Sequence, residues 1–195
     1  MASRRDKVIP YLKVAGLRRV LISTVCCVMS GCASMSGKDC LSTNWQDQGY
    51  RDGRMGFALS RLQDHRQACQ KVGINPDAAY YQTGYDVGIQ EYCTPANAIR
   101  EGRLGRSYQH SCPMNVEREF LSYYERGYWA YRSQQKLDGL HREMSQTQSR
   151  LDKETNHDQR QTLRRELREL DQQLKRARDE LNDAERRLQL DSLRW

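Results

Sequence analysis

The sequence predicts an all-α protein, a disulfide-stapled bundle of short helices followed by a long helical hairpin or coiled coil. No alternation of apolar and polar residues reaches the length of a strand. Prolines and capping side chains mark several helix starts between residues 40 and 133. After residue 133, leucines spaced alternately four and three residues apart form a heptad pattern.

Residues 1–31 have the parts of a secretory signal peptide: a basic start, a short apolar run and small residues before Cys32. The run is far shorter than the roughly 20 residues of a membrane-spanning helix. The residues before Cys32 resemble the bacterial lipobox, with Met29 where leucine is usual. The resemblance implies that Cys32 becomes the first mature residue and carries acyl chains such as palmitate. The alternative is an uncleaved anchor or an unrelated hydrophobic start.

Ala33 and Ser34 follow the proposed acylated cysteine. Because an aspartate there would favour the inner membrane of enteric bacteria, the resemblance implies the outer membrane, with the chain facing the periplasm. The acyl chains on Cys32 would then be the contact with the membrane.

The net charge of +7 depends mainly on the signal peptide. Residues 1–31 carry six basic residues and one acid, so the remainder has a net charge of only +2. A basic protein of this size would suggest a nucleic-acid partner. Because most of the positive charge lies in the predicted signal peptide, which is removed, we expect no nucleic-acid partner for the mature chain.

The cysteines divide in the same way. Of the seven, Cys26 and Cys27 lie in the signal peptide and Cys32 is the proposed lipid site. The remaining four are Cys40, Cys69, Cys93 and Cys112. In an oxidising periplasm an even set predicts two disulfides, each stabilising the fold by about 2–4 kcal/mol.

The mature chain divides into a tether, a cysteine-containing helical domain and a coiled-coil-like tail. These parts cover residues 32–39, 40–133 and 134–195. Predicted helices of the middle part lie near 42–55, 60–72, 76–92, 95–109 and from about 114 onward. Ser60 and Gln63 predict a capping box. Gly53 and Gly56 are expected to end the first of these helices, and Gly73 the second.

A glycine–aromatic repeat runs through these helices. Its copies are Trp45-x3-Gly49-Tyr50-x2-Gly53, Tyr80-x3-Gly84-Tyr85-x2-Gly88, Tyr123-x3-Gly127-Tyr128, and a degenerate Ala98-x3-Gly102 with Gly105. Glycine costs about 1 kcal/mol relative to alanine inside a helix, so the repeat needs an offsetting gain. One interpretation is close helix packing. The other is a glycine-floored cleft for a ligand, with candidate residues Trp45, Tyr85, Tyr128, Asp52 and Asp86.

Two apolar seams mark the tail. The first comprises Leu137, Leu140, Met144 and Leu151, and the second Leu163, Leu167, Leu170, Leu174, Ala177, Leu181, Ala184 and Leu188. The heptad phase slips between them, across residues 153–161. Either the chain turns at Asn156-His157-Asp158, with Asp158 and Gln161 capping a second helix, or one long helix continues.

The sequence contains no established catalytic motif. His65 lies one helical turn before Cys69, and His110 is next to Cys112, but neither spacing is that of a paired-cysteine zinc motif. Asp52 and Asp86 could act as paired acids, although such residues are more often solvated or paired with an arginine. We expect no catalytic residue, no metal and no cofactor.

A set of motifs resembles a known family. The set comprises Cys40-Leu41-x3-Trp45, Gly49-Tyr50-Arg51-Asp52-Gly53-x2-Gly56, His65-x3-Cys69, Pro76-Asp77, Gly84-x3-Gly88, Tyr92-Cys93-Thr94-Pro95 and Tyr108-x3-Cys112-Pro113. Over roughly residues 32–133 the chain resembles an uncharacterised bacterial lipoprotein family, domain-of-unknown-function family 2799. The resemblance implies an envelope lipoprotein with no established reaction, and keeps a ligand role for His65 open.

The order of the helices suggests a disulfide pairing. If successive helices alternate in direction, Cys69 and Cys112 share one end of the bundle and Cys40 and Cys93 the other. We therefore predict Cys40–Cys93 and Cys69–Cys112.

The function predicted from these features is a non-catalytic scaffold or protein-interaction module at the outer membrane. Residues 134–195 would bind a protein partner or a second copy through an exposed apolar stripe from Leu163 to Leu188. The alternative is a binding protein for a small envelope ligand such as a glycan fragment. A third possibility is an envelope enzyme.

Overall fold

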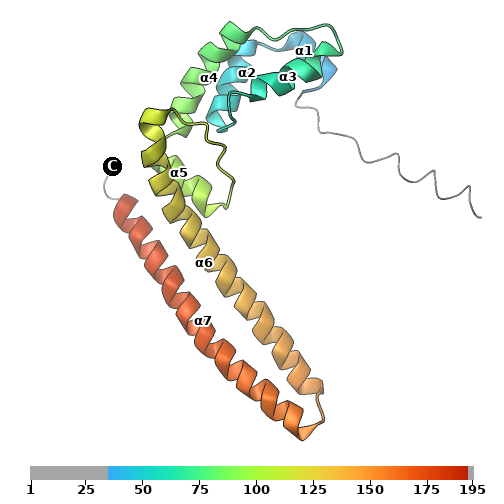
Figure 1. Cartoon of the computed structure of the whole chain (residues 1–195), viewed down its shortest axis with the longest axis vertical. Helices are drawn as coiled ribbons and strands as arrows, with labels where there is room; N and C mark the ends of the chain where they lie inside the picture. The colour runs from blue at the N-terminus through green and yellow to red at the C-terminus, as the bar shows by residue number, and fades with distance from the viewer. Residues whose placement is uncertain (1–34, 193–195) are drawn as a thin grey trace, which may run out of the picture.

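The computed structural model describes residues 35–192, and over this range the protein consists of seven α-helices without a strand (Figure 1). The helices are α1 (Gly37–Ser42), α2 (Trp45–Arg54), α3 (Arg61–Gln70), α4 (Ala78–Tyr92), α5 (Pro95–Arg103), α6 (Met114–Lys153) and α7 (His157–Ser192). The predicted signal peptide, Cys32 and the first residues of the predicted tether lie outside the described residues. The predicted all-α fold class is confirmed.

Glycines allow the backbones of α2 and α4 to touch. A Cβ atom added to Gly49 would overlap the carbonyl oxygen of Tyr81 on α4. In the reverse direction, a Cβ atom on Gly84 would overlap the carbonyl oxygen of Gln46 on α2. Because the obstacle is backbone in both cases, a side chain cannot move aside to admit a larger residue. The packing interpretation of the repeat is therefore correct.

The pair α5–α6 repeats the pair α2–α4 position by position. Gly102 on α5 packs against α6 at Gly127, as Gly53 on α2 packs against α4 at Gly88. Three residues beyond each first-helix glycine, the chain turns at a glycine with a φ of +74° (Gly56) or +66° (Gly105), and each turn is covered by a tyrosine ring. Left-handed φ values of this kind favour glycine.

One hydrogen bond closes each pair at the same place. The Tyr85 hydroxyl on α4 donates to the carbonyl oxygen of Phe57 at 2.8 Å. The Tyr124 hydroxyl on α6 donates to the carbonyl oxygen of Arg106 at 2.6 Å. Phe57 and Arg106 each follow the left-handed glycine, so the two pairs share the same turn and the same anchor.

Aromatic rings form most of the core between the two helix pairs. Tyr81 and Phe120 are almost completely buried, with Tyr92 stacked on Phe120 at a ring separation of 5.3 Å. Burial of a large ring stabilises a fold by about 1.5–3 kcal/mol. The rings therefore supply the apolar burial that the glycines lack.

Several helix boundaries differ from the predictions because the capping bonds differ. Ser36 and Asp39 form a capping box that starts α1, so the last residues of the predicted tether are helical. Ser60 makes no side-chain capping bond, and the predicted capping box with Gln63 is wrong. Asp77 caps α4, which begins at Ala78 and not near residue 76 as predicted. Thr94 and Pro95 start α5, as the sequence indicates.

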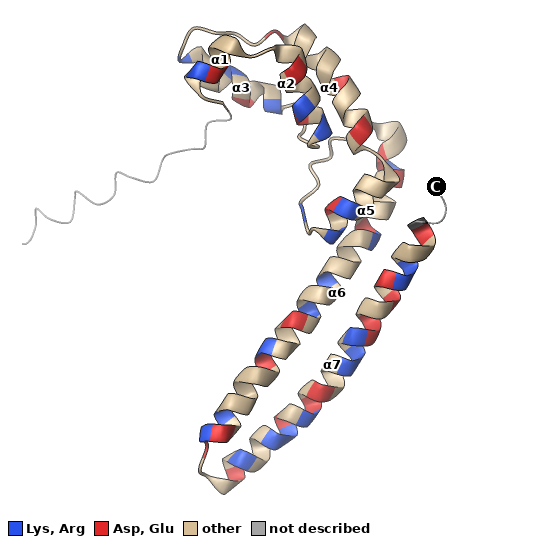
Figure 2. Ribbon diagram, turned by 180° about the vertical axis from the view of Figure 1, so that it is seen from behind, with Lys and Arg blue, Asp and Glu red and all other residues tan. Residues whose placement is uncertain are grey.

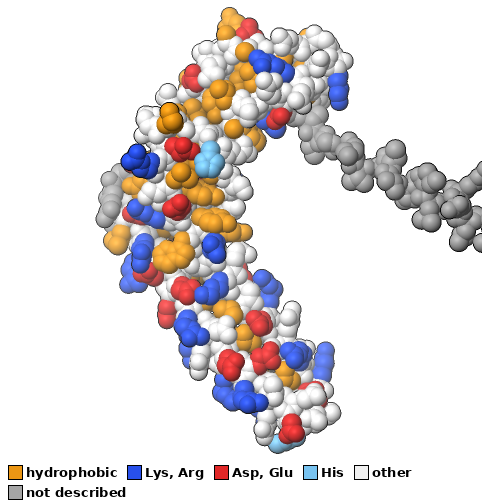
Figure 3. Space-filling view, viewed as in Figure 1, with side chains coloured by type: hydrophobic (Ala, Val, Ile, Leu, Met, Phe, Trp, Pro, Cys, Tyr) orange, Lys and Arg blue, Asp and Glu red, His pale blue; other side chains and the backbone are white. Residues whose placement is uncertain are grey.

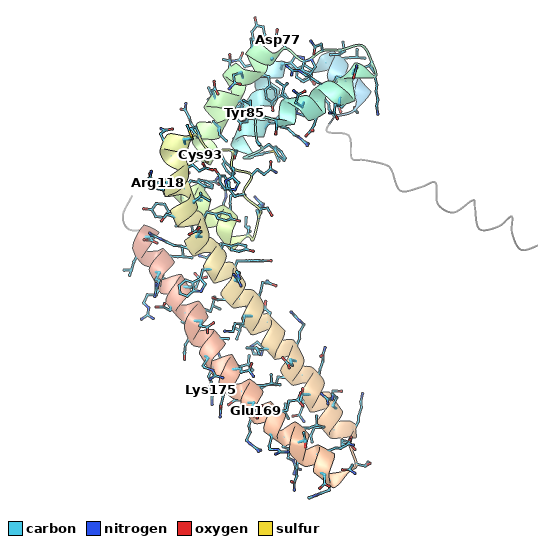
Figure 4. The ribbon with its side chains drawn as sticks, in the orientation of Figure 1. Asp77, Tyr85, Cys93, Arg118, Glu169 and Lys175 are labelled. Atoms are coloured by element: carbon cyan, nitrogen blue, oxygen red, sulfur yellow. A yellow bond between two sulfur atoms is a disulfide. The ribbon has the colours of Figure 1, made fainter. Side chains whose placement is uncertain are left out.

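The predicted disulfide pairing is wrong. The structure joins Cys40 to Cys69 and Cys93 to Cys112. Simple alternation of helix direction fails because α1 packs against α3, which places Cys40 beside Cys69. Cys93 lies where α4 ends, close to the start of α6 (Figure 4), and Cys112 precedes α6 directly. Each disulfide therefore closes a short local loop.

The tail is an antiparallel hairpin of α6 and α7, which Figures 1 and 2 show side by side along their length. Leu137 and Leu140 on α6 pack against Leu170, Leu174 and Ala177 on α7. The seam is therefore filled from both helices, and the hairpin interpretation is confirmed. The stripe from Leu163 to Leu188 that was expected to be exposed is covered by α6.

The hairpin turns without glycine or proline. Asn156 caps α7 by accepting from the backbone N–H groups of Asp158 and Gln159, so the predicted cap at Asp158 is wrong. Arg160 donates to the carbonyl oxygens of Leu151 at 2.9 Å and Glu154 at 2.7 Å. These bonds satisfy carbonyl groups at the end of α6 that have no partner within the helix.

The predicted boundary between residues 133 and 134 falls inside α6, which continues for 40 residues from Met114 to Lys153. The composition changes there because the first part of α6 packs on α5, where glycine is needed, and the later part packs on α7 alone. Among residues 35–192, no helix is both long and apolar enough to cross a membrane.

Substitution of two helical glycines should change stability in opposite directions. Gly49→Ala forces the helix pair apart and should lower the free energy of unfolding by about 1–3 kcal/mol or more. Gly139→Ala on α6 meets only the flexible end of Arg142 at 3.9 Å and should raise it by roughly 0.5–1 kcal/mol. Urea unfolding with the disulfides intact measures both. Equal effects of the two substitutions would contradict close packing at Gly49.

Candidate functional site

A buried polar cluster joins the first three long helices of the bundle. We call it the Asp52 cluster, and it comprises Asp52, Gln48, His65 and Tyr81. Asp52 Oδ2 lies 2.7 Å from His65 Nε2 and accepts a 2.7 Å hydrogen bond from the Tyr81 hydroxyl. Asp52 Oδ1 accepts from Gln48 Nε2 at 3.0 Å. Each oxygen of the carboxylate therefore has a partner.

Three helices deliver these side chains to one point. Asp52 and Gln48 are one turn apart on α2, His65 lies on α3, and Tyr81 lies on α4. The exposed fractions are 4% for Asp52, 1% for His65 and 0% for Tyr81. Burying a carboxylate is costly unless it is paired and hydrogen-bonded. The cluster meets that condition and thereby fixes α3 against the α2–α4 pair.

Burial also controls the ionisation of the tyrosine. Removal from water, followed by the hydrogen bond to Asp52 and the charge of that carboxylate, raises the pKa of Tyr81 well above its usual range. The pKa of Tyr85 rises to about 12, mainly through burial. Tyr81 therefore stays protonated at neutral pH and acts as a hydrogen-bond donor to Asp52.

Gln48, the least buried member of the Asp52 cluster, also lines a depression in the surface. The depression has a volume of about 470 Å³ and is lined by polar residues, including Gln48, Arg51 and Asp47. Gln48 accepts from Arg51 Nη2 at 2.7 Å while it donates to Asp52. The amide thus closes the carboxylate off from solvent with both of its polar atoms in use.

The second helix pair has an acid at the equivalent position. Glu101 on α5 is 5% exposed and, like Asp52, is followed directly by the glycine that packs on the partner helix. Its carboxylate accepts from Arg106 Nη1 at 3.0 Å. Arg106, in the loop after α5, is therefore a partner of Glu101, as His65 and Tyr81 are partners of Asp52. Both buried acids therefore serve to hold a neighbouring segment in place.

The candidate ligand residues do not form the predicted cleft. Tyr85 is 5% exposed, and its hydroxyl is used inside the bundle. Trp45 packs beside His65 at the edge of the aromatic core. Tyr128 lies on α6, stacked between other tyrosines and 37% exposed. The buried Tyr85 cannot line an open cleft, and Trp45 and Tyr128 pack against different rings, Trp45 beside His65 and Tyr128 between Tyr124 and Tyr131.

The two repeat aspartates lie in different environments. Asp52 is buried, whereas Asp86 is exposed on α4 and accepts a hydrogen bond from Gln82 one turn earlier. They do not form a pair of acids. The partners of Asp52 could not be inferred from spacing, because His65 is 13 residues away and Tyr81 is 29 residues away.

The histidine–cysteine neighbours do not form metal sites. Cys69 and Cys112 are in disulfides. His65 is engaged by Asp52, and His110 is mostly exposed, with Nδ1 3.1 Å from Glu117 Oε1. Within residues 35–192, no group of three or more histidine, cysteine or acidic side chains is arranged to hold a metal ion.

The Asp52 cluster predicts a large difference between two aspartate substitutions. Asp52→Asn removes the charge and places an amide where two donors converge, so the free energy of unfolding should fall by about 2–4 kcal/mol. Asp86→Asn is the matched control on an exposed surface and should change it by less than about 0.5 kcal/mol. Chemical unfolding of both variants checks the difference. If Asp52→Asn lowers the free energy of unfolding by less than about 0.5 kcal/mol, the Asp52 cluster does not stabilise the fold.

Comparison with known proteins gives one match. Residues 44–129 match the family model described as Protein of unknown function (DUF2799). No curated protein and no solved structure has significant similarity to the chain. The matched range contains both glycine-packed helix pairs and the Asp52 cluster, but ends before the hairpin turn. The match covers less than half of the chain, and over residues 44–129 it agrees with the resemblance to DUF2799 that the sequence motifs indicated.

Proposed function

We propose that the protein is a non-catalytic scaffold, a lipoprotein anchored in the outer membrane that presents a helical arm to a protein partner in the periplasm. The observation that carries this proposal is the α6–α7 hairpin. Its apolar seam is closed within the chain, and basic and acidic residues are distributed along both of its helices (Figure 2). An arm of this kind suits the display of a charged recognition surface.

The length of α6 supports the role of a spacer. At a rise of 1.5 Å per residue, its 40 residues span about 60 Å. The first part of α6 belongs to the bundle and the later part to the arm, so one continuous helix connects them. The end of α7 is also fixed to the bundle, because Arg103 on α5 binds Glu185 at 2.8 Å and Arg126 on α6 binds Asp191 at 2.7 Å.

The buried polar groups support a structural role for the bundle. Asp52, His65 and Tyr81 satisfy one another away from solvent, and Tyr85 and the repeat glycines are used in packing. These groups hold helices together, which agrees with a scaffold and gives no support to the glycan-cleft alternative.

The anchor is tested by acylation. Radiolabelled palmitate should be incorporated into the wild-type protein, and Cys32→Ala should abolish the incorporation because the thiol is the acceptor. Membrane fractionation should then show the wild-type chain with the outer membrane and Cys32→Ala released. Equal labelling of the two proteins would exclude Cys32 as the lipid site.

The scaffold role is tested by crosslinking in intact cells followed by mass spectrometry. Partner peptides should join mainly to α7 and the later part of α6. Arg168→Glu with Arg178→Glu, two exposed positions on α7, should reduce these products severalfold by reversing the surface charge. Arg118→Glu, exposed on the bundle part of α6, is the control and should leave them unchanged. Crosslinks confined to α1–α4 would contradict an interacting arm.

A further inference from the structure

The end of the bundle formed by α1 and the end of α3 carries an unusual combination of side chains. Leu41 is 67% exposed and Val72 is 40% exposed. Lys38, three residues before Leu41, and Lys71, directly before Val72, are also exposed. We call these four residues the α1–α3 patch. Figure 1 shows that this end lies opposite the hairpin turn along the longest axis of the molecule.

The α1–α3 patch is one surface rather than two separate segments. Cys40 and Cys69 join α1 to α3 covalently. Gly37 lies against Val72, since a Cβ atom on this glycine would be 2.8 Å from Val72 Cγ1. Leu41 is one turn from Gly37 and one turn from Lys38 on α1, so these positions share a face. The disulfide therefore holds the apolar and basic side chains in a fixed arrangement.

The charge of the α1–α3 patch suits an anionic surface. Lys38 and Lys71 contribute two positive charges. Asp39, next to Lys38, forms the capping box with Ser36 and contributes one negative charge, so the net charge of this end remains positive. Figure 3 shows basic side chains over this end of the molecule. Exposed leucine and valine beside lysine are the residue types that enter the boundary between phospholipid headgroups and acyl chains.

The position of Cys32 in the chain indicates that the anionic surface is the bilayer that holds its acyl chains. Cys32 precedes Ser36, the cap of α1, by four residues. A chain reaches at most about 3.6 Å per residue, so Lys38, the first residue of the α1–α3 patch and six residues after Cys32, lies within roughly 22 Å of an acylated Cys32. A bilayer that holds those acyl chains is therefore within reach of the patch.

We propose that the α1–α3 patch lies on the membrane and that Lys38 and Lys71 bind anionic phospholipid headgroups while Leu41 and Val72 enter the interface. This inference rests on the proposed acylation of Cys32. The acyl chains supply the affinity and the patch supplies a second contact, which fixes how the bundle sits on the bilayer. Contact at the patch leaves both helices of the hairpin uncovered.

Photocrosslinking to lipids tests the inference with the full acylated protein. The protein is reconstituted into vesicles of phosphatidylethanolamine and phosphatidylglycerol that contain a diazirine phospholipid, and labelled peptides are mapped by mass spectrometry. Label should appear on peptides with Leu41 and Val72. Peptides with Tyr80 and Val87 on α4 should remain unlabelled, although these side chains are 62% and 54% exposed.

Charge variants separate the headgroup contact from the anchor. Lys38→Gln with Lys71→Gln should lower labelling at Leu41 roughly tenfold or more, because each lysine near an anionic surface contributes to binding. Lys136→Gln with Lys175→Gln, both exposed on the hairpin, should leave it unchanged. If the acylated protein floats with vesicles but Leu41 and Val72 label no more than Tyr80 and Val87, the patch inference is wrong and the anchor stands. If the protein does not float, both are wrong.

Discussion

Contact between backbones at glycine is the constraint on which the bundle depends. At Gly49, Gly53, Gly84 and Gly88, the neighbouring helix places carbonyl or amide groups where a side chain would otherwise begin. Such a contact buries little apolar surface by itself. Its effect is to bring the flanking rings of Tyr81 and Tyr85 into a shared core, where each ring contributes more than the glycines lose. The arrangement also explains why the repeat combines glycine with aromatic residues.

Both helix pairs have this backbone contact at glycine, but they differ in the residues that surround it. In the first pair, α3 lies between α2 and α4 in the chain and returns to supply His65 to Asp52. The second pair has a loop without a helix between α5 and α6, and Arg106 from that loop reaches Glu101 instead. The space against Ile99 and Ala130 is taken by Ala184 and Leu188 of α7. The first pair therefore surrounds a buried polar cluster, and the second pair forms the base of the arm.

Local patterns predicted most of the helices, because capping and periodicity depend on neighbours within one or two turns. They offered glycine packing and the hairpin as one of two interpretations each, and the contacts between distant helices decided both. The disulfide pairing was not predicted correctly, since it depended on an assumed direction for every helix, and the short helix α1 was missed. A capping box at Ser36 and Asp39 was the available signal for α1. The Asp52 cluster brings together residues 13 and 29 positions apart, and no local periodicity carries such information. Asp52 was singled out as a candidate, but its partners were not.

The continuity of α6 has a mechanical consequence. Its first half is held by backbone contact with α5 at Gly102 and Gly127, and its second half is held by the seam with α7. The end of α7 returns to α5 and α6, where Ala184 is 1% exposed and Glu185 and Asp191 form ion pairs. A rotation of the arm would therefore have to separate glycine-packed backbones, break two ion pairs and expose Ala130 together. Because these contacts are lost as a set, the arm and the second helix pair are held together as one body.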